Sequence, residues 1–384
     1  MSSVSLGCRV DKTEENLNGW CEVERIPPGE VCVVCLGGDG TQDTRAANGN
    51  VKGIQEEINK VLGRGIPVYG IAYSFAKRGQ NKARKMEYAR RGMINSQGQC
   101  EKIAAMDNGQ EPDLAYIEEI YKRVIEPRIT KNRGTERIDV EEAAANLRKI
   151  TFMAHCHGAF VALKLEDVMA QKMSALGYAA KEQAFIQKQM LVVAQAPACP
   201  LGVSKSTVVG FLSANDCEMP HPLNYLSVYI DKRMREDWAY TYAVMGNDTL
   251  GKATTTPFEL RPCFLSGGMG NCFLIKQKYA YDKEEGPCLI NEKEHGFVGF
   301  HDEELTPDGK ILQKFAFNTM INGIKNSKQQ SKKLVPLPEI ETLVCQDEKE
   351  RNVFNLMCQN GEKLGRDAYN YGRALVAAQR QKQK

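Results

Sequence analysis

The feature that most constrains the fold of this chain is the alternation of short apolar runs with longer amphipathic segments. Runs rich in Val and Ile, typical of buried strands, occupy residues 30–38, 66–75, 150–155, 189–197 and 206–216. Segments with apolar residues at helical spacing separate most of them, at 51–65, 114–129, 140–149 and 158–176. Strands and helices in alternation predict an α/β fold with a mostly parallel, doubly wound sheet covered on both faces.

The 384 residues are enough for one large domain or two modest ones. We expect one α/β domain over residues 1–325, with insertions that act as lids at about 76–145 and 220–290. Residues 271–281 suggest a further strand and residues 309–325 a helix. Residues 326–338 are polar and then broken by proline, as in a linker, and 339–384 predict a helical tail.

Composition indicates an ordinary globular protein. Of the residues, 42% are hydrophobic and 26% charged, and the net charge of +3 favours no particular partner. The sequence shows neither an apolar leader at its start nor a run long enough to span a membrane. With thirteen scattered cysteines, these observations predict a cytoplasmic protein with reduced thiols. An effector exported without a cleaved leader would have the same features.

The stretch ITFMAHCHGAFVAL (150–163) carries the most specific chemistry, because a cysteine falls where a strand gives way to a helix. Cys156 has small residues two places away on each side, Ala154 and Gly158. A sharp strand–turn–helix needs such neighbours to expose a nucleophile. The N-terminus of the following helix would stabilise a thiolate, and its N–H groups would hold an oxyanion.

These residues resemble the nucleophile elbow of the α/β-hydrolase superfamily, with cysteine in place of serine as in hydrolases similar to dienelactone hydrolases. The resemblance covers roughly residues 30–325 and implies a triad in the order nucleophile, acid, histidine. Cys156 matches the nucleophile and Asp216 the acid after a later strand. His295 matches the base, with His301 as the alternative. The histidine would take the thiol proton and the carboxylate would fix its tautomer; no cofactor is implied.

The turn GGDGT (37–41) supports two interpretations. In NAD kinases and diacylglycerol kinases the same motif binds phosphates, and its aspartate takes part in phosphoryl transfer. Those enzymes need a nucleotide-binding unit before the motif, and only 36 residues precede it here. In a hydrolase, the loop after the strand beside the elbow supplies an oxyanion N–H. Gly38, Asp39 and Gly40 are therefore candidate pocket residues, together with the N–H of His157.

Short pairs extend the hydrolase resemblance to bacterial phospholipase effectors that carry a DGT turn. Asn50-Val51 follows the turn and Gly158-Ala159 follows the elbow, as in those proteins. The histidines beside Cys156 are expected at the rim of the pocket or hydrogen-bonded to backbone. His155 is an alternative site residue. Metal binding by Cys156 with His155 and His157 is disfavoured, because alternate residues at a strand end point in different directions.

Seven Lys or Arg residues within Lys77–Arg91 form a basic stretch that could meet an anionic group of a substrate. A solvated helix or loop is the alternative. Nucleic-acid binding would require interleaved aromatic residues, and Tyr88 is the only one there.

The sequence thus predicts an acyl hydrolase or acyltransferase acting on an ester, thioester or lipid-like carbonyl through a thioester intermediate. A catalytically silent hydrolase fold that binds partners is the first alternative, and a kinase using GGDGT the second. The substrate, the acyl acceptor and the oligomeric state are not encoded in these motifs.

Overall fold

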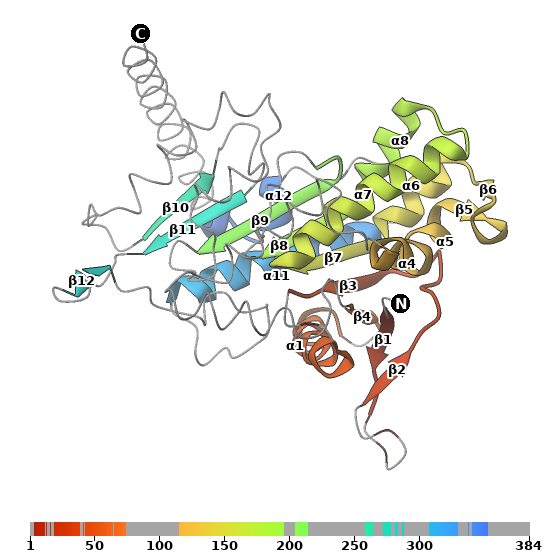
Figure 1. The fold of residues 1–384 in the computed structure, drawn as a ribbon. Helices are drawn as coiled ribbons and strands as arrows, with labels where there is room; N and C mark the ends of the chain where they lie inside the picture. Colours follow the sequence, from red (N-terminus) through yellow and green to blue (C-terminus); the bar gives the residue numbers. More distant parts are fainter. Residues whose placement is uncertain are drawn as a thin grey trace, which may run out of the picture.

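The computed structural model describes most of the predicted α/β domain. It covers residues 4–38, 41–73, 115–195, 204–213, 258–263, 272–277, 281–282, 286–287, 307–328, 337 and 340–351, apart from 12, 14, 15, 17, 18, 42 and 64. Within these ranges the main sheet has the strand order β10-β11-β9-β8-β7-β3-β4-β1-β2 (Figure 1). The protein is therefore of the α/β class, as the alternating pattern predicted.

The strands of the main sheet form a parallel centre with antiparallel edges. The parallel strands are β4 (Val68–Ala72), β3 (Cys32–Leu36), β7 (Ile150–His155), β8 (Leu191–Gln195), β9 (Thr207–Ser213) and β11 (Cys272–Gln277). At one edge, β1 (Ser5–Arg9) runs antiparallel to β4 and to β2 (Trp20–Glu22). At the other edge, β10 (Phe258–Cys263) runs antiparallel to β11.

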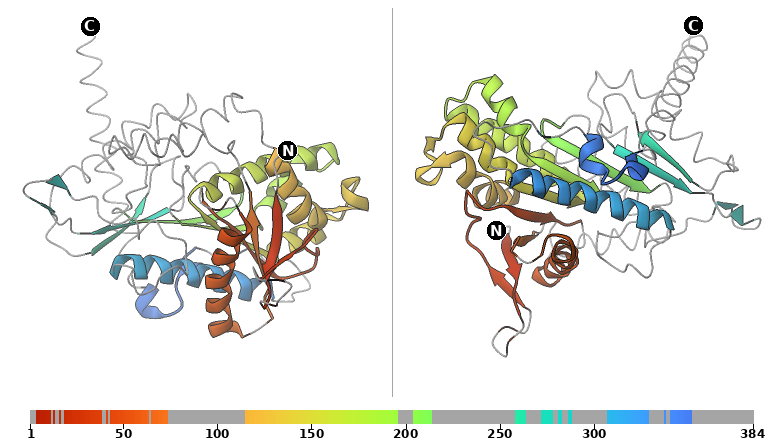
Figure 2. Two further views of the ribbon diagram at one scale, coloured as in Figure 1. Left: turned by 60° about the horizontal axis from the view of Figure 1, so that its bottom comes forward. Right: turned by 180° about the vertical axis from the view of Figure 1, so that it is seen from behind.

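Helices cover both faces of this sheet. One face carries α1 (Thr44–Leu62) and α11 (Pro307–Ser327), and the other carries α4 (Ala115–Val124) and α7 (His157–Ala175) (Figure 2). The chain also forms α5 (Glu126–Ile129), α6 (Val140–Arg148), α8 (Ala180–Gln187) and α12 (Ile340–Val344). Short strands β5 (Thr130–Lys131) with β6 (Glu136–Arg137), and β12 (Tyr281–Asp282) with β13 (Gly286–Pro287), form two further pairs.

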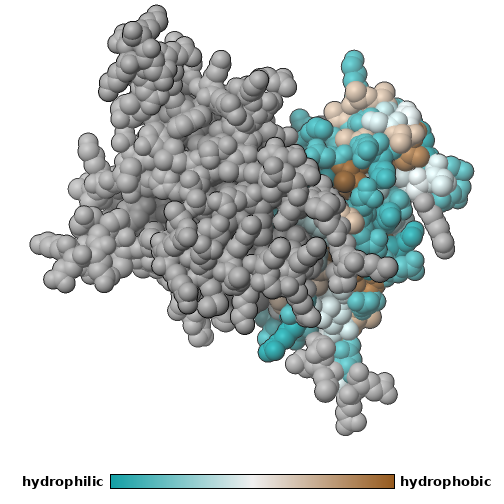
Figure 3. Space-filling view, in the orientation of Figure 1, coloured by the Kyte–Doolittle hydropathy of each residue, from teal (hydrophilic) through white to brown (hydrophobic). Residues whose placement is uncertain are grey.

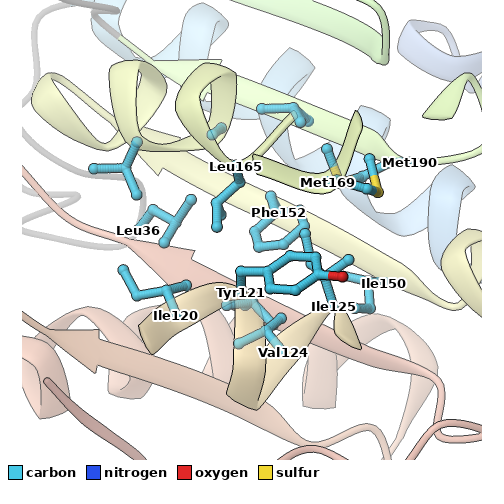
Figure 4. Close-up of a cluster of buried hydrophobic side chains, with 14 of the residues drawn as sticks. Leu36, Ile120, Tyr121, Val124, Ile125, Ile150, Phe152, Leu165, Met169 and Met190 are labelled. Carbon is cyan, nitrogen blue, oxygen red and sulfur yellow. The ribbon is translucent and has the colours of Figure 1, made fainter. Parts of the chain in front are cut away.

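Alternate residues of the central strands feed two hydrophobic cores, one on each face. On β3, Val34 and Leu36 point to the α4–α7 side, whereas Val33 and Cys35 point to the α1–α11 side. In the first core, Phe152 packs with side chains of α4 and α7 (Figure 4). Burial on both faces explains why these strands read as continuous apolar runs rather than alternating ones.

Residues 115–145, which lie in the first expected lid, form α4–α6, and many of their side chains join the first core. Arg128 of α5 is buried and donates to the carbonyls of Pro28 (2.9 Å), Glu30 (2.8 Å) and Asn146 (2.9 Å). This part of the insertion is therefore built into the domain.

The start of the expected tail, residues 340–351, packs on α11. Leu343 and Val344 belong to the second core, and Glu350 binds Lys314 (2.6 Å) and Asn318 (2.9 Å). Most of the predicted linker and of the rest of the tail lies outside the described residues. The same holds for most of the second expected lid, residues 220–290.

The described surface in Figure 3 is mainly hydrophilic, with scattered hydrophobic residues. Among the described residues, the large exposed hydrophobic side chains are Val61 on α1 and Phe185 on α8, which lie on separate helices. None of the described helices combines the length and hydrophobicity needed to cross a bilayer.

Candidate active site

The turn between β7 and α7 has the geometry of a strained elbow. Cys156 adopts φ 52° and ψ −117° as the N-cap of α7. Among the described residues, Asn132 is the other non-glycine residue with positive φ, and Asn tolerates this conformation better than most residues. The Cys156 N–H donates to the carbonyl of Gln195 at the end of β8 (3.0 Å). A hydrogen bond to the neighbouring strand thus supports a conformation that cysteine rarely adopts.

Gly158 lets the first turn of α7 approach the end of β3. A Cβ atom at this position would lie 2.0 Å from the carbonyl oxygen of Leu36 and 3.0 Å from that of Gly37. No side chain can fit against rigid backbone at these distances. The small residue two places after Cys156 is therefore explained by contact with β3 as well as by the turn itself.

Gly38 brings the loop after β3 against the cysteine. A Cβ atom at Gly38 would lie 2.9 Å from Cβ of Cys156 and 3.6 Å from its Sγ, and 3.1 Å from Nδ1 of His155. The structure thus brings together three of the residues selected from sequence. His155 ends β7 and is half-buried.

Hydrogen bonds tie the ends of this loop together. The Thr41 N–H donates to the Gly38 carbonyl (2.9 Å), and Nδ2 of Asn50 donates to Oγ1 of Thr41 (3.3 Å). Asn50 is buried on α1, and the next residue, Val51, belongs to the second core. The Asn50-Val51 pair that the sequence singled out therefore joins the loop to the helix that follows it.

Sequence reasoning missed two tyrosines that support the elbow and the loop. Tyr73, just after β4, is fully buried; its hydroxyl donates to the Gly37 carbonyl and its N–H to the Thr41 carbonyl (3.3 Å). Its ring stacks on Tyr116 of α4, with centroids 5.5 Å apart and planes 4° from parallel. The only sequence signal was their position, directly after a strand and at the start of a helix.

His157 lies in the interior rather than at a rim. Its side chain is 1% exposed, and Nε2 lies 3.4 Å from the hydroxyl of Tyr116. The ring also packs on Phe160, with centroids 5.3 Å apart. Its backbone N–H is the first of α7. The imidazole is thus a buried support, and the N–H remains the candidate oxyanion donor.

Cys156 is 3% exposed, is not in a disulfide, and belongs to the first hydrophobic core. The 19-residue helix α7 begins directly after it, so the positive end of the helix dipole lies beside this residue. The arrangement can present sulfur next to two candidate backbone donors, one from α7 and one from the loop after β3.

The other predicted site residues lie outside the described residues. These are Asp39, Gly40, Asp216, His295, His301 and the basic stretch Lys77–Arg91. Within the described part of the chain, no three His, Cys, Asp or Glu side chains are grouped so as to hold a metal ion.

No model of a known protein family matches this sequence, and no curated protein matches it.

Proposed function

We propose that the protein is an acyl hydrolase or acyltransferase of the α/β-hydrolase type, with Cys156 as its nucleophile. The observation that carries this proposal is the backbone of Cys156, at φ 52° and ψ −117° between a central parallel strand and a helix. Strained backbone of this kind costs roughly 1–3 kcal/mol and is concentrated at functional sites. A cysteine that served only to fill the core would not require it.

The neighbouring loop supports the same proposal. In α/β-hydrolases one oxyanion donor is the N–H after the nucleophile and another comes from a strand-to-helix loop beside it. Here the loop between β3 and α1 meets these requirements, because β3 is the direct neighbour of β7 and Gly38 packs against Cys156. Ligands of α/β sheets bind beyond the carboxyl ends of the strands, where both features lie.

The proposed reaction begins when the Cys156 thiolate attacks the substrate carbonyl and a C–S bond forms. The carbonyl electron pair moves onto oxygen, which the N–H groups of His157 and Gly38 would stabilise. When the carbonyl reforms, the leaving group departs with a proton and a thioester remains. Water or another acceptor then attacks the thioester and restores the thiolate. The family resemblance assigns proton transfer to His295, oriented by Asp216, with His301 as the alternative base.

One observation favours a second candidate, a silent hydrolase fold that only binds partners: the side chain of Cys156 is 3% exposed. The kinase alternative is less favoured, because the described elements before GGDGT are the antiparallel hairpin β1–β2 and the strand β3. A kinase would need a parallel β–α–β unit there to bind its nucleotide.

The rate of iodoacetamide labelling at neutral pH, read by peptide mass spectrometry, tests the nucleophile. We expect Cys156 to label faster than an ordinary thiol, because a base within reach would take its proton. Cys21, which is exposed on β2, is the matched control for an ordinary thiol. His295→Ala or Asp216→Asn should remove the advantage of Cys156. Incubation with p-nitrophenyl butyrate should acylate Cys156, and the Cys156→Ala variant should form no such adduct.

If Cys156 labels no faster than Cys21, or labels only when the protein unfolds, the nucleophile proposal is wrong. Fast labelling without acylation by any ester or thioester would favour the silent fold. ATP turnover that is lost in Asp39→Ala would favour the kinase.

A further inference from the structure

We infer that Tyr73 is a positioning residue that fixes the Gly37–Gly38 peptide so that its N–H serves as an oxyanion donor. This inference rests on the proposed function of Cys156. The tyrosine hydroxyl donates to the Gly37 carbonyl, which belongs to the same peptide unit as the Gly38 N–H. Tyr73 was not among the residues selected from sequence.

The geometry of the peptide bond converts this hydrogen bond into an orientation. In a trans peptide the C=O and the N–H point in opposite directions, so a partner that holds the carbonyl also sets the direction of the N–H. With the Gly37 carbonyl directed to Tyr73, the Gly38 N–H is directed to the opposite side of the peptide. Gly38 itself lies against Cys156, since a Cβ there would be 3.6 Å from Sγ.

A Gly–Gly peptide needs such support. Glycine populates positive and negative φ about equally, so a peptide between two glycines can rotate at low cost. The same freedom lets the loop come close to the cysteine, where a side chain at Gly38 would collide with it. The Gly37–Gly38 peptide could point either its N–H or its carbonyl oxygen toward Cys156. The hydrogen bond from Tyr73 disfavours the second orientation, in which the carbonyl oxygen would repel an oxyanion.

Tyr73 is well placed to act as a fixed point. Its N–H donates to the Thr41 carbonyl (3.3 Å), so it contacts both ends of the loop, and its ring stacks on Tyr116. Tyr116 in turn lies 3.4 Å from Nε2 of His157, the residue whose N–H is the other candidate donor. One buried cluster therefore contacts both sides of the proposed oxyanion hole.

Two reactions of the same thiol separate positioning from a merely structural role. Acylation by p-nitrophenyl butyrate passes through an oxyanion, whereas alkylation by iodoacetamide is a displacement that forms none. We expect Tyr73→Phe to slow acylation of Cys156 by about 10- to 100-fold, somewhat less than the loss of a whole oxyanion donor. Its rate and pH profile of alkylation should stay at the wild-type values.

Tyr178→Phe is the matched control. Its hydroxyl is also buried and lies within hydrogen-bonding distance of two backbone carbonyls, those of Ile129 (2.9 Å) and Ile138 (2.8 Å), but it lies beyond the far end of α7. We expect this variant to acylate at the wild-type rate at a temperature where both variants are folded.

Acylation of Tyr73→Phe at the wild-type rate would overturn the inference and leave the proposed function intact. A parallel fall in acylation and alkylation, or an equal fall in Tyr178→Phe, would also overturn it, because it would indicate a general loss of structure. If the wild-type protein is not acylated at Cys156 at all, the proposed function fails and the role of Tyr73 fails with it.

Discussion

At the scale of single residues, backbone crowding decides which side chains the elbow accepts. Cys156 has a positive φ, and Gly158 has no room for a Cβ beside Leu36 and Gly37. These restrictions act on the main chain, so they hold whatever substrate the site takes. They also predict that replacement by alanine lowers the stability of the protein at Gly158 but not at Gly29.

We expect Gly158→Ala to lower the free energy of unfolding by about 3 kcal/mol, the upper range for overpacking a core. Its Cβ would lie 2.0 Å from the Leu36 carbonyl oxygen, and neither α7 nor β3 can move without disturbing the first core. Urea unfolding followed by circular dichroism measures the change.

Gly29→Ala provides the control, because the nearest atom to a Cβ there is Nζ of Lys149 at 4.0 Å. This variant should unfold close to the wild-type midpoint. Equal unfolding midpoints for the two variants would show that α7 does not pack on β3 as described.

Several residues of the candidate site were predictable from sequence. Cys156 and Gly158 were selected from the elbow pattern and Gly38 from the GGDGT turn, and the structure brings them together. Tyr73 and Tyr116 were not, because the loop, α4 and the elbow are far apart in the chain and no short pattern records their stacking. The burial of His157 was missed because a polar residue beside a candidate nucleophile was expected at the rim of the pocket or hydrogen-bonded to backbone.

At the scale of elements, short polar contacts attach helices to loops. Glu166 of α7 is buried and accepts from Oγ of Ser204 (2.6 Å) and from the N–H of Lys205 (2.7 Å), just before β9. Burial raises the pKa of the Glu166 carboxyl above its ordinary value, although these hydrogen bonds oppose the shift.

The sign of the resulting pH dependence follows from this direction. The folded protein binds the Glu166 proton more tightly than the unfolded chain, so its contribution to stability falls as pH rises from about 4.5 through the raised pKa. Glu166→Gln should remove this fall, so the stability difference between variant and wild type should change with pH in that window.

Asp167→Asn is the matched control at the next position, where the side chain is 60% exposed. Its stability difference from wild type should change far less over the same pH range. Urea unfolding from pH 4 to pH 8 measures both differences. If the stability difference between Glu166→Gln and wild type does not change with pH, the Glu166 carboxyl keeps its ordinary pKa in the folded protein.

Element boundaries followed the sequence well where apolar runs were long and buried on both faces. The runs at 30–38, 150–155 and 189–197 contain β3, β7 and β8. The hairpin β1–β2 was not expected, because its five- and three-residue strands carry glycine and charged residues and form an edge of the sheet. Short edge strands take their pairing from neighbours rather than from their own composition.

At the scale of the whole molecule, the described sheet is most strongly held at its centre. Strands β3, β7 and β8 have partners on both sides and belong to both cores, whereas β2 and β10 are edge strands. Opening the centre would expose both cores at once, so it should occur only with global unfolding.

Hydrogen exchange read by mass spectrometry should therefore show the slowest amides in β3, β7 and β8 and much faster exchange in β2. The comparison is internal, because all of these strands exchange in the same sample under native conditions and are read from one digest. Protection of β2 equal to that of β7 would show that the N-terminal hairpin opens only together with the central sheet.

The position of the hairpin has a consequence for synthesis. β1 and β2 are synthesised before β4, yet β1 pairs with β4, which comes about sixty residues later in the chain. The edge of the sheet to which β1 adds forms only after β4 has paired with β3. β3 in turn pairs with β7, which begins at residue 150. The hairpin thus leaves the ribosome well before its partner strand is in place, and chaperones that bind nascent chains could contact it during this interval.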